Sequence, residues 1–440
     1  MASTYLSVST TSSGTRTKWT TSFWVKRCST GAEHTIFGSY LDSNNKDKIA
    51  FDSSDRLQFA SVQAGGYSNG GNLVTNRLFR DTNAWYHIVL RWDTNNSTAD
   101  DRMKIWVNGV EETSFSSRTN PTSGRESLIN YTTYTKVGNN GSSGNYLDGV
   151  LSHIHFCDGY AYAASDFGST DSTTGEWKIN TSPNVTYGTN GFWWLKDSIA
   201  TTDHSPNSNP FTVSGGTLTK TEDCPSNVFA TYNPLDIKAG DNNTYVNGNN
   251  TLQVQTSGGA GSRSTLAVTS GKYYAEFKHN TTGSDWTGVA PYERPAEDAN
   301  TSSESVLIYS NTGSGWTAYV NGVNQGSGGI KNSYASGEIL MLALDMDNDL
   351  LYVGVNGGWY NGTDCSGTSP SNGFSLTANR TYAFKTLSGS TQTNVNANFG
   401  NGYFGTTAVA SAGTNASGNG IFEYNVPTGY TALSTKGLNL

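Results

Sequence analysis

Eleven Asn-Gly dipeptides punctuate this chain of 440 residues. Asn and Gly both tolerate a positive φ angle, which the two central residues of a type I′ hairpin turn require. The clearest cases follow runs of β-forming residues: KIWV precedes Asn108, TAYV precedes Asn321 and LYVGV precedes Asn356. Such runs recur at spacings of about 8–12 residues, which is typical of sandwiches and barrels. The pattern therefore predicts a protein built of antiparallel β-hairpins.

Composition and charge exclude several classes of protein. Charged residues make up 14% of the chain and aromatic residues 12%, so a disordered chain and a coiled coil are both excluded. The net charge is −8 and the sequence holds no basic run, so we expect no nucleic-acid partner. The longest apolar runs, such as residues 339–344, are too short for a membrane span, and we expect no membrane insertion. Because residues 1–14 have neither a basic nor an apolar region, we expect no signal peptide.

The distribution of strand-like runs predicts two tandem antiparallel β-sandwiches in an all-β fold. A polar stretch and two prolines, Pro225 and Pro234, interrupt the runs, which resume at Thr251. We place the first sandwich at residues 1–200, a linker at 201–234 and the second sandwich at 235–440. Residues 405–420, rich in small side chains, are expected to form a surface loop before a final strand near 422–424.

The first half resembles the concanavalin A-like jelly rolls of the laminin-G and pentraxin kind. Five segments carry the resemblance in order: TTSFWVK at 20–26, DRLQF at 55–59, NAWYHIVLRW at 83–92, RMKIWVNGV at 102–110 and YLDGVLSHIHF at 146–156. The resemblance implies a lectin, an adhesion module or a glycoside hydrolase. The hydrolases of this fold need paired carboxylates in an E-x-D-x-E pattern, and the sequence has no such pattern. We therefore expect no enzymatic activity and no catalytic residues.

Metal sites are weakly indicated. Members of this fold bind calcium through loop Asp and Asn residues, and Asp93, Asn95 and Asp148 are available, but their spacing is not diagnostic. A structural calcium ion is therefore possible but unsupported, and we expect no cofactor. His153, His155 and Cys157 would share one face of a strand, which suggests either a metal site or a strand at a surface or subunit interface.

The second half resembles SPRY (B30.2-like) sandwiches. The segments that carry this resemblance are SGKYYAEF at 270–277, WTGV at 286–289, ILMLALDMDNDLLYVGV at 339–355, TYAF at 381–384 and NVNANFG at 394–400. Ala275 stands where the family usually has Trp, and Met341 where it usually has Gly. Within the third segment, Asp345, Asp347 and Asp349 imitate the start of an EF-hand, but the required Gly and Glu are absent, so we expect a hairpin turn.

The order of the two halves, joined by DCPSNVFATYNPL at 223–235, resembles particle proteins of tailed bacteriophages. That resemblance implies a tail-fibre, head-fibre or decoration protein, made in the host cytoplasm and located in the virion. Its partners would be other virion proteins and a host-surface glycan or receptor. It also implies a homo-oligomer, with a trimer favoured. Two alternatives stay open: a cellular carbohydrate-binding lectin, and a glycoside hydrolase.

Seven side chains at or beside predicted turns of the second half form a candidate ligand-binding set. Planar aromatic faces stack on sugar C–H surfaces and anchor protein interfaces at low entropy cost. Packing in the core or at a subunit contact is the alternative for each of them. The set is Trp286, Tyr292, Arg294, Trp316, Tyr334, Trp359 and Tyr360.

Overall fold

The computed structural model divides the chain into two compact units, Met1–Lys220 and Thr221–Leu440. The structure describes residues 3–8, 10, 12–132, 135–142, 144–237, 242–254, 260–281, 284–293, 304–326, 328–389 and 393–439. Both units consist of antiparallel sheets with very little helix, which confirms the predicted all-β fold.

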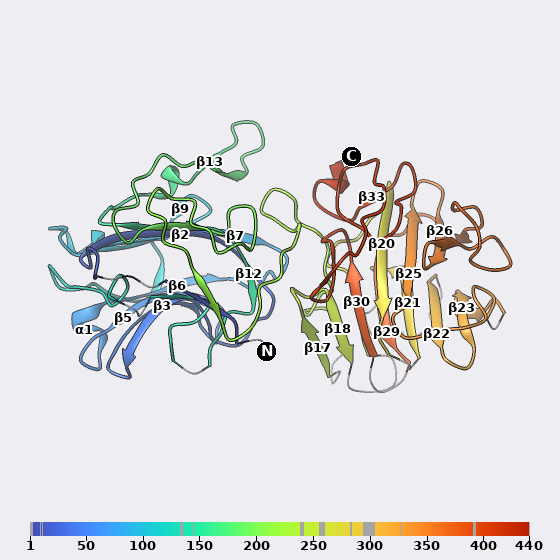
Figure 1. The fold of residues 1–440 in the computed structure, drawn as a ribbon, viewed down its shortest axis with the longest axis horizontal. Coiled ribbons are helices and arrows are strands. Elements are labelled where there is room, and N and C mark those ends of the chain that lie inside the picture. The colour runs from blue at the N-terminus through green and yellow to red at the C-terminus, as the bar shows by residue number, and fades with distance from the viewer. Residues whose placement is uncertain are drawn as a thin grey trace. The chain divides into compact units, whose positions relative to one another are not determined.

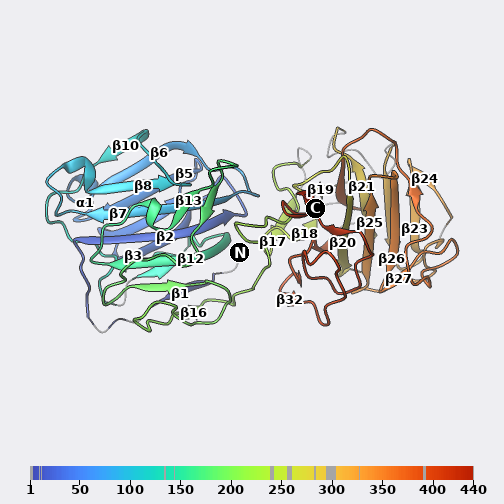
Figure 2. The same cartoon turned by 90° about the horizontal axis from the view of Figure 1, so that it is seen from above.

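Two sheets form the first unit and lie as two layers (Figure 1). One sheet has the strand order β10 (Phe115–Thr119), β6 (Asn72–Leu78), β5 (Arg56–Val62), β4 (Asn45–Phe51), β3 (His34–Asp42), β11 (Lys136–Val137), β1 (Tyr5–Ser7) and β16 (Thr212–Ser214). The other has the order β15 (Phe192–Trp194), β12 (Gly149–Asp158), β2 (Lys18–Arg27), β7 (Trp85–Asp93), β8 (Met103–Val107) and β9 (Val110–Glu111). Figure 2 shows the same strands running side by side.

The core of the first unit lies between these layers because alternate residues of each strand point inward. Trp19 and Trp92 lie on neighbouring strands, are fully buried and stack with their ring centroids 6.3 Å apart. Phe156 packs against Trp19 from β12. A smaller apolar cluster covers the outer face of the second sheet. It includes residues near the β13 (Gly168–Thr170) and β14 (Trp177–Ile179) pair, which lies above that sheet in Figure 1. The short helices are α1 (Tyr67–Gly70) and the 3-10 turns Ala99–Asp101 and Ala164–Asp166.

The second unit is also a sandwich. One sheet has the order β17 (Asn243–Val246), β18 (Thr251–Val254), β30 (Thr393–Asn398), β20 (Lys272–His279), β25 (Ile339–Asp345), β26 (Leu350–Val355) and β27 (Gly358–Trp359). Beside it, β28 (Phe374–Ser375) pairs with β26, and β33 (Thr431–Ala432) with β20. The facing sheet has the order β19 (Gly261–Arg263), β29 (Tyr382–Ser388), β21 (Asp285–Pro291), β22 (Val306–Asn311), β23 (Gly315–Val320) and β24 (Val323–Asn324). A two-stranded pair, β31 (Tyr403–Phe404) with β32 (Thr407–Ala408), and the 3-10 turn Gly437–Asn439 complete the unit.

The hairpin turns confirm the reading of the Asn-Gly dipeptides. Asn108 and Gly109 join β8 to β9 with φ angles of 47° and 81°. Asn321 joins β23 to β24 and Asn356 joins β26 to β27, each with a positive φ angle followed by a glycine of positive φ. Two successive positive φ angles are the signature of a type I′ turn.

The structure differs from the expected linker at residues 201–234. Strand β16 pairs with β1 and so belongs to a sheet of the first unit. Phe229 and Tyr232 form bridges with Ser434 and Ser264 and so belong to the second unit. The segment looked like a linker because it is polar and rich in turn residues, whereas its long-range pairing cannot be seen in its composition.

Within the described part of the chain, no helix is long and apolar enough to cross a bilayer.

Candidate functional site

The expected ligand-binding residues do not form one site. Trp316 and Tyr334 lie together, edge to face around His279, and Trp316 is fully buried. Its indole Nε1 donates a hydrogen bond to Glu338 at 2.7 Å. Trp286 lies elsewhere, 94% buried in a cluster with Tyr309 and Tyr319. These three residues therefore serve mainly the packing of the second sandwich.

The remaining members of the set are scattered. Tyr360 stacks on Phe374 with ring centroids 5.5 Å apart. Tyr292 is partly exposed, and the Arg263 guanidinium lies over its ring. Arg294 lies outside the described residues. Trp359 lines the cleft described next, and the other described members of the set do not line that cleft.

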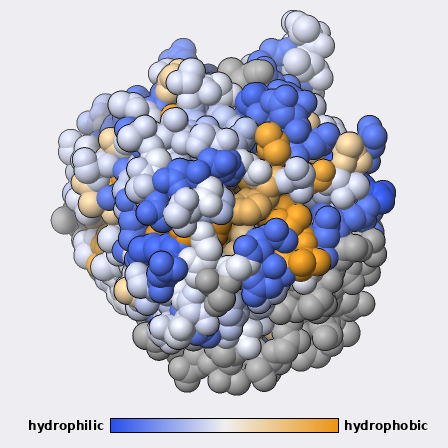
Figure 3. Space-filling model, turned by 90° about the vertical axis from the view of Figure 1, so that its right-hand side faces the viewer, coloured by the Kyte–Doolittle hydropathy of each residue, from blue (hydrophilic) through white to orange (hydrophobic). Residues whose placement is uncertain are grey.

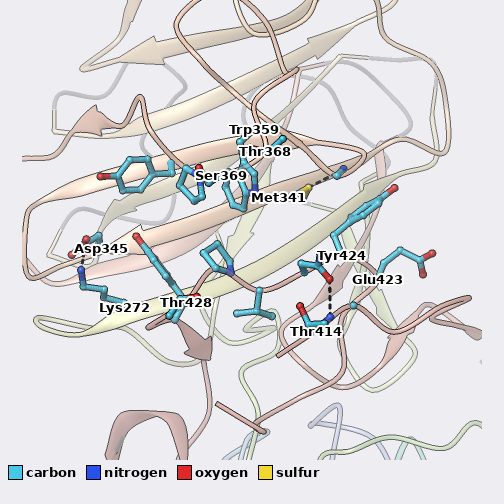
Figure 4. Close-up of a pocket in the computed structure, with 18 of the residues that line it drawn as sticks. Lys272, Met341, Asp345, Trp359, Thr368, Ser369, Thr414, Glu423, Tyr424 and Thr428 are labelled. Atoms are coloured by element: carbon cyan, nitrogen blue, oxygen red, sulfur yellow. Dashed lines mark hydrogen bonds and ion pairs between the residues drawn. The ribbon is translucent and has the colours of Figure 1, made fainter. Parts of the chain in front are cut away.

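That cleft lies on the outer face of the sheet containing β20, β25, β26 and β27, and it has a volume of about 940 Å³. Strand alternation and register explain its floor. Lys272 is directly opposite Asp345, and Met341 is opposite Gly354, which is in turn opposite Trp359. A side chain at Gly354 would meet the indole of Trp359, so glycine leaves the indole room to lie on the sheet. Figure 4 shows Met341 and Trp359 between the two ends of the cleft.

The opposite wall is formed by residues 411–430, which we call the C-terminal strap. Ser411, Thr414, Tyr424, Thr428 and Tyr430 of this strap line the cleft. The strap turns back on itself through hydrogen bonds, including one from the Thr414 amide to Asn425 Oδ1 at 2.8 Å, drawn in Figure 4. The sequence predicted a strand near 422–424. The structure instead has irregular chain there, because these residues bind side chains of the sheet rather than a neighbouring strand.

A buried carboxylate fastens the strap to the sheet. Glu276 of β20 is fully buried and accepts hydrogen bonds from the backbone amides of Glu423 and Tyr424, at 2.9 and 2.8 Å. It also accepts from the Tyr274 hydroxyl at 2.9 Å and from Asn398 Nδ2 at 3.3 Å. Burial raises the pKa of Glu276 to about 7, although all four hydrogen bonds favour the charged form.

The cleft has a charged pair at one end. Lys272 Nζ lies 2.8 Å from Asp345 Oδ2, and Asn348 Nδ2 donates to the same oxygen at 2.9 Å. Burial opposes ionisation of Asp345, but the hydrogen bonds from Lys272 and Asn348 prevail and lower its pKa. Asp345 also accepts the backbone amides of the β25–β26 turn, which confirms the hairpin predicted for the three aspartates. At the other end of the cleft lie Tyr424 and Glu423 (Figure 4).

The arrangement of aromatic and polar groups defines what the cleft can do. The side chains of Trp359 and Tyr430 are buried, whereas those of Tyr352 and Tyr424 are half-buried. Hydroxyl side chains complete the rim: Thr368 and Ser369 from the loop that follows β27, and Thr428 from the strap. Figure 3 shows one face of the second unit, on which hydrophilic residues surround a smaller apolar group. The lining exposes more polar than apolar surface, so the cleft suits a ligand that carries many polar groups.

A buried Ser, His and Asp lie together in this unit but do not form a catalytic relay. Ser310 Oγ and Asp285 Oδ2 both approach the same atom, Nδ1 of His279, at 3.4 and 3.5 Å. A triad needs the serine and the carboxylate at different ring nitrogens. The His279 side chain is also fully buried, so a substrate has no access to it.

The suggested metal ligands of the first unit are also not assembled. Asp93 lies beside the Lys18 end of β2, whereas Asp148 lies beside the opposite end, where its carbonyl accepts the Cys28 amide. His153 has a φ angle of 48° at a register shift in β12, which breaks the expected alternation. His155 is buried and bonded to the Tyr187 hydroxyl. Across the residues that the structure describes, no group of three His, Cys, Asp or Glu is placed to hold a metal ion.

Comparison with known proteins supports the fold. Residues 1–166 match the sequence model of a family described as the concanavalin A-like lectin/glucanases superfamily. This match lies within the first unit. The antiparallel sandwiches of the two units confirm the predicted fold class. Among curated proteins, none matches the chain in sequence.

Several solved structures are similar to stretches of the chain at low sequence identity. The SPRY domain of human HERC1 is 18% identical, and the match covers 38% of this chain and 96% of that domain with a TM-score of 0.29. A SAP-like pentraxin from Limulus polyphemus is 16% identical over 49% of this chain and 87% of its own, with a TM-score of 0.32. Domains LG4-5 of the mouse laminin alpha1 chain are 9% identical over 89% and 84% of the two chains, with a TM-score of 0.30.

Proposed function

We propose that this chain is a non-enzymatic structural protein of a bacteriophage particle, in a tail fibre, head fibre or decoration, that binds glycans of the host surface. The observation that carries the binding role is the cleft between the β20–β27 sheet and the C-terminal strap. It combines the half-buried aromatic rings of Tyr352 and Tyr424 with a rim of hydroxyl groups, while Trp359, only 4% exposed, forms part of its floor.

These groups match the chemistry of a sugar. One face of a pyranose ring presents C–H groups, which pack on aromatic rings, while its edge presents hydroxyl groups that donate and accept hydrogen bonds. The description of the family that residues 1–166 match names lectins and glucanases, and both of these classes of protein bind carbohydrates. Both halves of the chain therefore support carbohydrate binding.

The particle role rests on the resemblance of the joined halves and of residues 223–235 to phage particle proteins. In this role the chain assembles with other virion proteins, as a homo-oligomer and in the first instance a trimer. A cellular lectin is the alternative, and it would have the same cleft without assembly into particles.

Two experiments test the two parts of the proposal. A glycan array probed with the full chain tests binding, and the Tyr424→Ala variant should lose the signal while Tyr160→Ala, an exposed tyrosine of the first unit, should keep it. Mass spectrometry and immunogold labelling of purified particles test the location. A chain absent from particles would contradict the virion role, and an array without any bound glycan would contradict the binding role.

A further inference from the structure

The charges in the cleft point to the class of sugar it takes. Among the described residues that line it, only Lys272 carries a positive charge, and its ammonium group is already paired with Asp345 at 2.8 Å. Glu423 adds a carboxylate at the other end, where its Oε2 accepts the backbone amide of Ala410 at 2.8 Å and points away from the labelled residues of the floor in Figure 4. The lining therefore holds more negative than positive charge and has no unpaired cation to receive an acidic group.

An acidic sugar would be at a disadvantage at both ends of this cleft. Its carboxylate or sulfate would lose water on entry and would have to compete with Asp345 for Lys272, or lie near Glu423. Burial of a charge without a partner is costly, and like charges at close range repel each other. Protein sites that recognise carboxylates and phosphates use free Arg or Lys side chains, which this lining lacks.

The remaining polar groups suit hydroxyl groups instead. The side chains of Thr368, Ser369 and Thr428 each carry a hydroxyl group that can donate and accept, and all three residues are exposed at the rim. The volume of about 940 Å³ is near the upper end of the range for ordinary ligand sites. This volume is larger than one sugar ring would fill. Figure 4 shows side chains at both ends of the cleft, so a chain of several rings could contact both.

We infer that this cleft binds an oligosaccharide of several rings that carries no acidic groups, and that Glu423 and the Lys272–Asp345 pair exclude carboxylated and sulfated sugars. The inference rests on the proposed glycan binding and adds the class of ligand and the residues that select it. The aromatic residues supply the affinity for the sugar rings, and the charged residues discriminate against acidic sugars.

The test compares uncharged and acidic probes on the full-length chain. Isothermal titration with cellohexaose, maltohexaose and mannohexaose gives the uncharged affinities, and hexagalacturonate and hexaguluronate give the acidic ones. The variant Glu423→Gln removes one carboxylate without changing the size of the side chain. Its control is Glu126→Gln, which makes the same change of net charge on the first unit, where Glu126 pairs with Arg16.

We expect at least one uncharged probe to bind and the acidic probes to bind on the order of tenfold more weakly, as one like-charge contact near a protein surface dictates. Glu423→Gln should narrow the difference in affinity between uncharged and acidic probes, whereas Glu126→Gln should change neither this difference nor the affinity for uncharged probes. Added salt should strengthen acidic binding to the wild-type chain, because it screens the repulsion.

The outcomes separate the inference from the function on which it rests. Acidic probes that bind as tightly as uncharged ones, or a difference that Glu423→Gln leaves intact, overturn the inference while glycan binding stands. Uncharged binding that survives Tyr424→Ala also overturns it, because the sugar then lies elsewhere. If the wild-type chain binds no probe of either class, the inference and the proposed glycan binding both fail.

Discussion

Glu276 makes the second unit sensitive to pH in a direction opposite to most carboxylates. Its pKa is raised from an ordinary value of 4.5 to about 7, because burial outweighs its four hydrogen bonds. The unfolded chain holds this proton only below about pH 4.5, whereas the folded chain holds it up to about pH 7. The contribution of Glu276 to stability is therefore complete below pH 4.5 and is lost as the pH rises through 7.

The magnitude follows from the difference between the two pKa values. One pKa unit corresponds to about 1.4 kcal/mol, so a rise from 4.5 to about 7 makes a difference of about 3 kcal/mol in the free energy of unfolding. The variant Glu276→Gln has a side chain of the same size that does not titrate. Its amide cannot accept at both oxygen positions, so one of the amides of Glu423 and Tyr424 loses its acceptor. Relative to the ionised carboxylate, that loss costs about 1–3 kcal/mol.

Scanning calorimetry of the full chain from pH 4.5 to pH 8 measures this effect. The difference in stability between wild type and Glu276→Gln should be largest at pH 4.5 and should shrink by about 3 kcal/mol toward pH 8, at about 2–4 °C per kcal/mol for a unit of this size. Asp47→Asn serves as the control, because burial raises the pKa of Asp47 to about 6 in the first unit. Asp47→Asn should change the unfolding transition of the first unit and leave that of the second unit unchanged. A Glu276→Gln difference that is flat with pH would refute the raised pKa.

Three further outcomes are expected. Burial, aided by His153, lowers the pKa of His87 to about 3. The contribution of His87 to the free energy of unfolding is therefore complete above pH 6.5 and is lost as the pH falls, by up to about 1.4 kcal/mol per pH unit. In chemical denaturation of the first unit, His87→Gln should reduce this dependence of stability on acid pH. Asp203→Ala should destabilise the first unit by about 1–3 kcal/mol in thermal unfolding, because the carboxylate accepts the amides of Trp193 and Asn209; no loss would count against this bond network. Gly400→Ala should lower the melting temperature of the second unit, because Gly400 has a φ angle of 123° and a Cβ would lie 2.4 Å from the Phe229 ring; an unchanged melting temperature would contradict that packing.

The sequence predicted those features whose cause is local. The turns at Asn108, Asn321 and Asn356 follow from two adjacent residues, because a type I′ turn depends on their own φ angles. The end of the first unit was misplaced because β16 depends on pairing with β1, about two hundred residues away.

The candidate site was only partly predictable for a related reason. An aromatic residue beside a turn can close the end of the core, as Trp316 does, or lie on an outer face, as Trp359 does. The choice depends on what covers that face, and here the cover is the strap. One signal was present in the sequence: Met341, where the resemblance to SPRY sandwiches breaks, lies on the floor of the cleft. Departures from a family pattern on the outer face of a sheet are therefore worth testing as site residues.

The cleft and the Glu276 carboxylate belong to one arrangement. Glu276 bonds the backbone of Glu423 and Tyr424, and the side chains of these same two residues form one end of the cleft. Any change in this fastening shifts the tyrosine on which a sugar ring would stack and the carboxylate that would repel an acidic one. Glu276→Gln should therefore weaken binding of uncharged sugars, although Glu276 does not line the cleft itself. Binding that is unchanged in this variant would show that the amides of the strap hold their places without the carboxylate.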